Sequence, residues 1–241
     1  MEPIRRPVRI GFLVPPGNPT VEVEMIALAP PNVSVHFTRM VAHGAAGAHE
    51  GLLARTRTQI AHVAENAALL AMVRPRVIAM AHTAMSATLG AAGEAELVPR
   101  MERELGIPFV TAFGSVLAAL GTPYDADSTA RTRAHLEAHG IEVVSEGRLE
   151  GVVNIYDETA ARAHELARRI DVPAAQAVFL SGLGMPTVAT LEAMERDLGK
   201  PVISAAAAMM WNALRAAGET APLAGFGRLL AGRRQGSPLR A

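Results

Sequence analysis

The 241-residue sequence contains no cysteine, and this absence excludes disulfide bonds, thiolate metal sites and cysteine nucleophiles. Aromatic residues make up only 4% of the chain, and its formal net charge at pH 7 is zero. A chain without an excess of either charge has no long-range field to attract nucleic acid or an acidic membrane. Its apolar runs are too short to span a bilayer or to form a signal-peptide core. We therefore expect a cytoplasmic protein with no nucleic-acid or membrane partner.

Two segments of the chain are nearly repeats of each other. Residues 101–120 read MERELGIPFVTAFGSVLAAL, and residues 194–214 read MERDLGKPVISAAAAMMWNAL. Each follows an apolar run that ends in small polar residues, at His82 and Thr83 in the first copy and at Ser181 and Gly182 in the second. Such a duplication predicts two similar halves with a shared site between them.

Short apolar runs alternate with helical patterns along most of the chain, which is typical of parallel sheets covered by helices. The predicted strands are 8–14, 33–39, 77–81, 109–111, 141–144, 177–180 and 201–204, and the predicted helices include 52–72, 126–139, 158–170, 187–198 and 205–217. The fold class is thus α/β, with two pseudo-symmetric lobes of parallel sheet flanked by helices. We place the first lobe at 1–115 and the second at 116–204, with a helix at 205–220 packing back on the first lobe and a flexible tail at 232–241.

The residues that follow the predicted strands are the candidates for a binding site. In parallel sheets, ligands gather at the carboxyl ends of the strands. These ends carry small polar residues next to helix starts, a setting that favours anions, and they fall at 15–20, 82–86, 111–115, 181–184 and 204. The sequence therefore predicts a site for a carboxylate or phosphate.

Each polar residue at these ends also has a purely structural interpretation. His82 could transfer protons, because an imidazole titrates near neutrality, or it could simply form local hydrogen bonds. Thr83, Ser86, Ser115 and Ser181 could donate to a carboxylate or cap helices, and Thr20 could cap a helix that begins after it. The chain has no G-x-S-x-G or G-x-G-x-x-G pattern, which disfavours a hydrolase triad and a nucleotide site. His43 and His49 lack a carboxylate at metal-ligand spacing, so we expect solvated histidines there and no metal.

Several segments together resemble the aspartate/glutamate racemase superfamily, and within it the branch of maleate cis–trans isomerases and arylmalonate decarboxylases. These segments are IGFLVPPGNPTVEVE, LAPPNVSVHFTRM, RVIAMAHT, TPYDAD and VFLSGLGMPTVATLEAMERDLGKPVISAAAAMMWNALRAAG. The resemblance implies two pseudo-symmetric α/β lobes with the site between them, no metal or organic cofactor, and an enolate-type intermediate. Relatives have a longer segment between a helix that is expected to end near Leu120 and Pro123, so either the second lobe is one strand short or another segment fills the edge of its sheet.

The resemblance also assigns residues. It implies that Asn18, Thr83 and Tyr124 bind the substrate carboxylate, with Asn154 as a less secure second asparagine. The two catalytic cysteines of the family fall at His82 and at Gly182, which Ser181 and Leu183 flank in the substrate-binding segment. A family member with these replacements has only one titratable side chain, His82, at the two cysteine positions.

We therefore predict a cofactor-independent isomerase or lyase that acts on a small carboxylate or dicarboxylate, with His82 moving a proton on one face. The alternative is a catalytically inactive relative that binds a small carboxylate as a sensor or accessory protein. An apolar, Ala- and Met-rich stretch at 205–211 either forms a contact with a second copy of the chain or belongs to the core.

Overall fold

The protein is described here by a computed structural model that covers residues 7–44, 47–111 and 119–232. Within these ranges the chain forms two four-stranded, fully parallel sheets, ordered β2-β1-β3-β4 and β6-β5-β7-β8. The strands are β1 (Val8–Val14), β2 (Val33–Arg39), β3 (Val77–Met80), β4 (Phe109–Val110), β5 (Ala119–Thr122), β6 (Glu146–Arg148), β7 (Val178–Leu180) and β8 (Val202–Ser204). The two sheets share one strand order, which confirms the predicted α/β fold with two pseudo-symmetric lobes.

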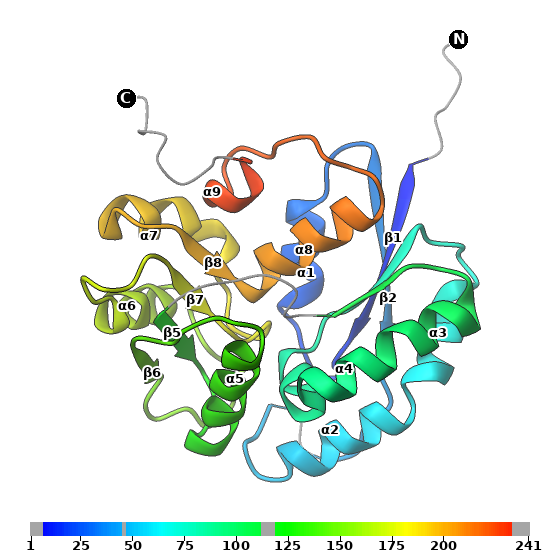
Figure 1. The fold of residues 1–241 in the computed structure, drawn as a ribbon, viewed down its shortest axis with the longest axis horizontal. Helices are drawn as coiled ribbons and strands as arrows, with labels where there is room; N and C mark the ends of the chain where they lie inside the picture. The colour runs from blue at the N-terminus through cyan, green and yellow to red at the C-terminus, as the bar shows by residue number, and fades with distance from the viewer. Residues whose placement is uncertain (1–6, 45–46, 112–118, 233–241) are drawn as a thin grey trace.

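Helices cover the sheets, as the crossover connections of parallel strands require. They are α1 (Val21–Leu28), α2 (Leu52–Ala61), α3 (Val63–Ala71), α4 (Thr83–Leu105), α5 (Ala126–Ala138), α6 (Ala160–Ile170), the short 3₁₀ helix η1 (Val188–Thr190), α7 (Leu191–Leu198), α8 (Ala205–Ala216) and α9 (Gly227–Leu230). Figure 1 shows α5, α6 and α7 around the sheet of β5 to β8, and α2, α3 and α4 around β1 and β2. No helix in the described ranges is long and apolar enough to cross a membrane.

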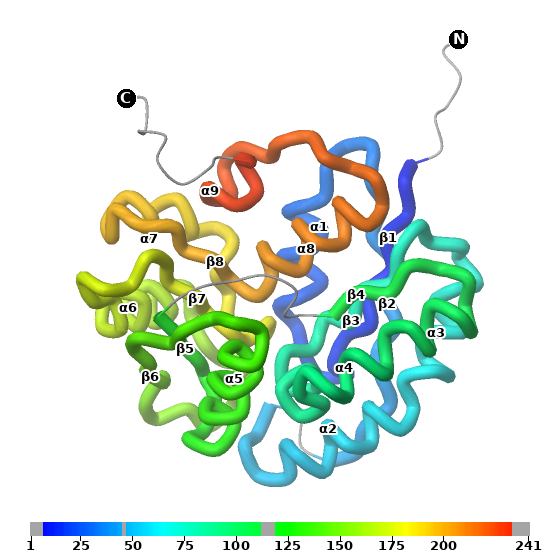
Figure 2. Tube along the Cα trace, in the orientation of Figure 1, coloured from blue at the N-terminus to red at the C-terminus, as the bar shows by residue number. Residues whose placement is uncertain are grey.

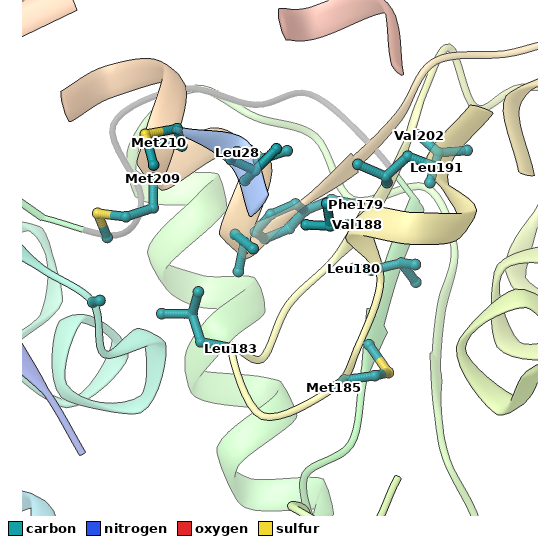
Figure 3. Packing of buried hydrophobic residues seen from close by; sticks show 14 of the residues in the cluster. Leu28, Phe179, Leu180, Leu183, Met185, Val188, Leu191, Val202, Met209 and Met210 are labelled. Atoms are coloured by element: carbon teal, nitrogen blue, oxygen red, sulfur yellow. The ribbon is translucent and has the colours of Figure 1, made fainter. Parts of the chain in front are cut away.

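Alternating side chains of β1 and β3 enter two different cores, one on each face of the first sheet. Ile10, Phe12 and Val14 of β1 belong to a large cluster, whereas Leu13 belongs to a smaller one with Met80 of β3. The large cluster continues into the second lobe through Phe179 of β7, and Figure 3 shows Phe179 together with Leu28, Val188, Met209 and Met210. One continuous core therefore joins the two lobes.

The helix α8 is part of this shared core. Its residues Ala205 to Met210 are buried, and the helix packs against α1, β3 and β4 of the first lobe as well as β8 of the second. Figure 2 shows α8 beside α1, between the two groups of strands. The apolar stretch at 205–211 thus lies mostly in the interior, and it does not form an exposed face for a second copy.

The repeated motif ends a helix in the same way in both lobes. MEREL closes α4 and MERDL closes α7, and each is followed by a glycine in the left-handed region, Gly106 (φ 65°) and Gly199 (φ 68°). In each lobe the strand that follows this glycine is an edge strand of its sheet, β4 in the first and β8 in the second. The repeat is broken after β4, because residues 119–122 form β5, whereas the corresponding part of the second copy forms α8.

Three sequence expectations are wrong. Residues 119–122, expected at the end of a helix, form β5 and pair with both β6 and β7, so of the two alternatives for the second lobe another segment completes the sheet and no strand is missing. The strand expected at 141–144 begins later, at Glu146, because Leu120 near the start of β5 pairs with Glu146. The single helix expected at 52–72 divides at His62 into α2 and α3.

Some expectations fall outside the described residues. They are the boundary between lobes at 115 and 116, Ser115, and all but the first residue of the tail at 232–241.

Candidate functional site

A small cavity of about 50 Å³ lies where the carboxyl ends of the two sheets meet. In the first sheet, β1 and β3 are neighbours whose crossovers leave in opposite directions, and ligands collect at such a switch point. β5 and β7 occupy the same place in the second sheet. The lining residues come from the loops after these four strands, from the loops after β2 and β6, and from α2 and the start of α4. They are Pro15, Pro16, Gly17, Asn18, Ala42, Gly44, Gly47, Leu52, Arg55, Gln59, Ala81, His82, Thr83, Ala84, Tyr124, Ile155, Tyr156, Leu183 and Gly184.

His82 is the N-cap of α4, and both of its ring nitrogens are engaged. Nδ1 lies 3.3 Å from the backbone nitrogen of Met85 and accepts that N–H, so the ring proton must be on Nε2. Nε2 then donates to Oε1 of Gln59 at 2.8 Å. Burial lowers the pKa of His82 to about 4, which keeps the imidazole neutral at pH 7. The Nε2–H donor of His82 is therefore already bonded to Gln59, which lines the cavity, and the lone pair of Nδ1 is already used by Met85.

Thr83 and Tyr124 connect the two lobes at the cavity. The Thr83 hydroxyl, at the start of α4, lies 2.7 Å from the Tyr124 hydroxyl, which follows β5. Burial raises the pKa of Tyr124, so its hydroxyl keeps its proton and can donate. The N–H groups of Thr83 and Ala84 belong to the first turn of α4, where a helix supplies no acceptors of its own. This corner of the cavity therefore concentrates donors.

Asn18 lines the cavity, and the oxygen of its carboxamide is already hydrogen-bonded. Its Oδ1 accepts the N–H groups of Thr20 (2.9 Å) and Val21 (3.1 Å), so Asn18 caps α1 in place of Thr20, which was expected to do so. The NH₂ end of Asn18 is then the part left for a ligand. The Thr20 hydroxyl instead donates to the carbonyl of Gly184 in the second lobe.

Arg55 and Tyr156 complete the wall of the cavity, and no sequence pattern indicated either residue. Arg55 is held in place through hydrogen bonds to the carbonyls of Ala48 and Glu50. Burial raises the pKa of Tyr156 to about 12, although the nearby positive charges of Arg55 and Arg39 oppose this. The described lining residues include one arginine and no carboxylate, which favours an anionic ligand.

The remaining predicted residues lie around the cavity with different roles. Leu183 lines it, whereas Ser181, Gly182 and Asn154 are not among the lining residues. The side chain of Asn154 accepts the N–H of Tyr156 at 2.9 Å, so it orients a residue that does line the wall. The Ser181 hydroxyl is fully buried and has no hydrogen-bond partner among the described residues.

Gly182 could not carry a side chain without rearrangement. Its φ of 112° is rarely adopted by other residues, and a Cβ there would lie 2.8 Å from Cδ and Cγ of Pro123 and 3.5 Å from the Tyr124 hydroxyl. The Pro123 ring therefore occupies the space that a Cβ would need, whereas the Tyr124 hydroxyl would be in ordinary contact with it. A cysteine at this position would strain the present backbone.

The chain matches known proteins over most of its length. A family model described as arylmalonate decarboxylase covers residues 10–230. The maleate isomerase of Nocardia farcinica is 31% identical over 244 residues, which span 92% of this chain and 95% of that protein. The arylmalonate decarboxylase of Bordetella bronchiseptica is 30% identical, over 70% of this chain and 77% of that protein.

The fold matches solved structures equally well. A cysteine-to-serine variant of the Nocardia farcinica maleate cis–trans isomerase, with a covalently bound succinylcysteine intermediate, superimposes with a TM-score of 0.83 at 26% identity. The match covers 94% of this chain and 99% of that one.

Proposed function

Because this chain belongs to the arylmalonate decarboxylase family, we propose that it is a cofactor-independent lyase or isomerase that acts on a small carboxylate or dicarboxylate. Its relatives include both decarboxylase and isomerase enzymes. The observation that carries the proposal is the cavity between the sheets, where hydroxyls, first-turn N–H groups and Arg55 meet without a carboxylate among the described lining residues. Such a set of donors suits an anion whose charge grows during the reaction.

Decarboxylation is the reaction that requires the fewest catalytic groups from these residues. When the bond to the departing CO₂ breaks, its electron pair moves into the remaining carboxylate and forms an ene-diolate, and this step needs no base. The hydroxyls of Thr83 and Tyr124 and the N–H groups at the start of α4 are suited to hold that charge. A single well-placed donor of this type contributes about 10²–10³-fold to the rate of a reaction.

The ene-diolate must then take one proton on carbon. We assign this proton to Nε2 of His82, whose neutral imidazole is still a stronger acid than the carbon acid that is formed, and water restores the proton afterwards. Gln59 must release Nε2 for this step. Because Gly182 has no side chain, the proton arrives on one face only.

This assignment disfavours two other reactions of such a fold. Racemisation needs an acid and a base on opposite faces of one carbon, and Gly182 supplies neither. The Nocardia farcinica isomerase was captured as a succinylcysteine, and a thiolate adduct of that kind cannot form in a chain without cysteine. A second candidate function is the binding of a carboxylate without catalysis. It is favoured by the hydrogen bonds that both ring nitrogens of His82 already make.

The test separates these functions by measuring binding and turnover independently. Malonate, phenylmalonate and maleate are screened by thermal shift, and each compound that stabilises the chain is followed by proton NMR in D₂O. We expect one malonate to lose CO₂ and to gain a single deuteron at its α-carbon. Stabilisation without any turnover would instead support the binding protein.

The variant His82→Asn tests the assigned proton donor. Asparagine is a good N-cap residue, so it keeps the acceptor for Met85 while it removes Nε2–H. We expect turnover to fall by about 10²–10⁴-fold while the thermal shift is retained. His62→Asn, at an exposed histidine that pairs with Glu65, is the control and should be fully active. Unchanged turnover in His82→Asn would remove His82 from the reaction.

A further inference from the structure

Three side chains of the kinds that ligate metals meet where α4 of the first lobe packs against α5 of the second. Glu94 lies in α4, and His135 and His139 stand four residues apart at the end of α5, on one face of the helix. One potential ligand atom from each residue lies within 4.8 Å of the other two. None of the three lines the cavity described above.

The spacing is close to that of a metal site. Nε2 of His135 lies 3.2 Å from Oε2 of Glu94, and the two imidazole rings have their centres 4.5 Å apart. A tetrahedral zinc with bonds of 2.0–2.2 Å holds its ligand atoms about 3.4 Å apart. The glutamate and the first histidine are therefore already at ligand spacing, and the second histidine, whose ligand atom lies within 4.8 Å of theirs, needs to approach them by at most about 1.4 Å.

The hydrogen bonding of the cluster also prepares it for a cation. Nδ1 of His139 lies 2.8 Å from the carbonyl oxygen of His135, which can only accept, so Nδ1 carries the proton and the lone pair of His139 is on Nε2. A bond of this kind, from the second ring nitrogen to a backbone carbonyl, orients metal-binding histidines in many proteins. Burial alone would raise the pKa of Glu94, but hydrogen bonds from His135, Ser86 and Thr111 outweigh it and lower that pKa, which favours the carboxylate.

We propose that Glu94, His135 and His139 bind a divalent transition metal of the zinc class and that this metal joins the two lobes. Two imidazoles and a carboxylate are a donor set that suits Zn²⁺, and the exposed position of His139 leaves room for water as a fourth ligand. Nε2 of His135 can bind the metal only after it gives up the proton that it shares with Glu94, and in a neutral imidazole this proton moves to Nδ1 of the same ring.

Such a metal would join the two helices that follow the residues whose hydroxyls meet across the lobes. α4 begins at Thr83 and α5 begins two residues after Tyr124, but Gly90, with φ 65° and ψ 177°, breaks the helical geometry of α4 between Thr83 and Glu94. The role we assign is structural, and it does not depend on the reaction proposed above.

The experiment uses the full chain after treatment with a chelator and titrates it with Zn²⁺ and Co²⁺. We expect one ion per chain, a Tm raised by about 5–10 °C at a hundredfold excess over Kd, and the visible absorption of tetrahedral Co²⁺. The variant His139→Asn changes an exposed ligand and should fold normally, but it should lose the Co²⁺ spectrum and most of the Tm rise.

His62→Asn removes an exposed histidine next to a carboxylate elsewhere on the first lobe, and it should bind the metal as the parent chain does. Absence of stoichiometric binding in the parent chain would overturn the proposal. Binding that is equal in His139→Asn and in the parent chain would overturn it as well.

Discussion

His82 links local structure and chemistry within a single side chain. It caps α4 through Nδ1, and it holds Gln59 of α2 through Nε2, so the ring orientation is fixed from both sides. The contact at Nδ1 favours the neutral imidazole, because a proton on Nδ1 would face the N–H of Met85. Burial acts in the same direction and lowers the pKa of His82.

The free energy of unfolding should depend on pH because His82 is neutral in the folded protein. An unfolded chain protonates His82 near pH 6.5, whereas the folded chain resists protonation until about pH 4. The stability that this difference provides is complete above pH 6.5 and is lost as the pH falls toward 4. Between pH 7 and pH 4.5, the parent chain should lose about 2 kcal/mol more than His82→Asn, as measured by urea unfolding at both values. Equal losses in the two proteins would show that the folded ring protonates at its ordinary pKa.

At the scale of elements, Glu24 fastens helix α1 to the start of η1 in the other lobe. Its Oε1 accepts the backbone N–H groups of Thr187 at 2.6 Å and Val188 at 2.8 Å, more than 160 residues away in the sequence. Burial raises the pKa of Glu24, although these bonds oppose the rise. A carboxyl group at this place therefore acts mainly as an acceptor for two buried donors.

Substitutions of Glu24 should separate the acceptor from the charge. Glu24→Ala leaves two buried N–H groups without a partner and should cost about 2–4 kcal/mol of unfolding free energy. Glu24→Gln keeps one carbonyl oxygen for both donors and should cost less than about 1 kcal/mol. The control is Glu22→Ala, on the same helix as Glu24, which breaks a partly exposed ion pair with Arg39 of β2 and should have a small effect. The free energy of unfolding of each variant is measured by chemical unfolding. If Glu24→Ala is no less stable than Glu22→Ala, the role of Glu24 as a buried acceptor is contradicted.

For the molecule as a whole, the cavity exists because two similar sheets present their switch points to each other. The single core that runs from β1 through α1 and α8 to β7 fixes this arrangement, and the hydrogen bond between Thr83 and Tyr124 crosses it at the cavity. The two lobes should therefore unfold together, and their contact at the cavity should contribute to the stability of both.

A double-mutant cycle of Thr83→Val and Tyr124→Phe measures this contact. Each single variant removes one hydroxyl and leaves the other buried without its partner, whereas the double variant removes both. We expect a coupling free energy of about 1 kcal/mol from urea unfolding of the four proteins. A coupling of zero would mean that the two hydroxyls do not bind each other in solution.

Much of the site was predictable because it follows the strands directly. Asn18, His82, Thr83 and Leu183 all come after predicted strands, and the carboxyl ends of parallel strands converge, so their presence at one cavity follows from local patterns, whereas only the family resemblance indicated Tyr124. The family resemblance added residue roles, and these stay predictions until variants are measured.

The rest depended on how distant segments pack. Arg55 and Gln59 lie in a helix whose sequence does not show that it faces the cavity, and Glu94 meets His135 and His139 only because α4 packs on α5. The strand β5 likewise became visible only through its partners β6 and β7, since a four-residue apolar segment fits the end of a helix equally well. The sequence by itself determined the alternation of strands and helices, the duplicated halves and the absence of cysteine, because these can be read from the order of residues along the chain. The tertiary structure decided which side chains face one another, because burial and contact across the chain depend on the packing of whole elements.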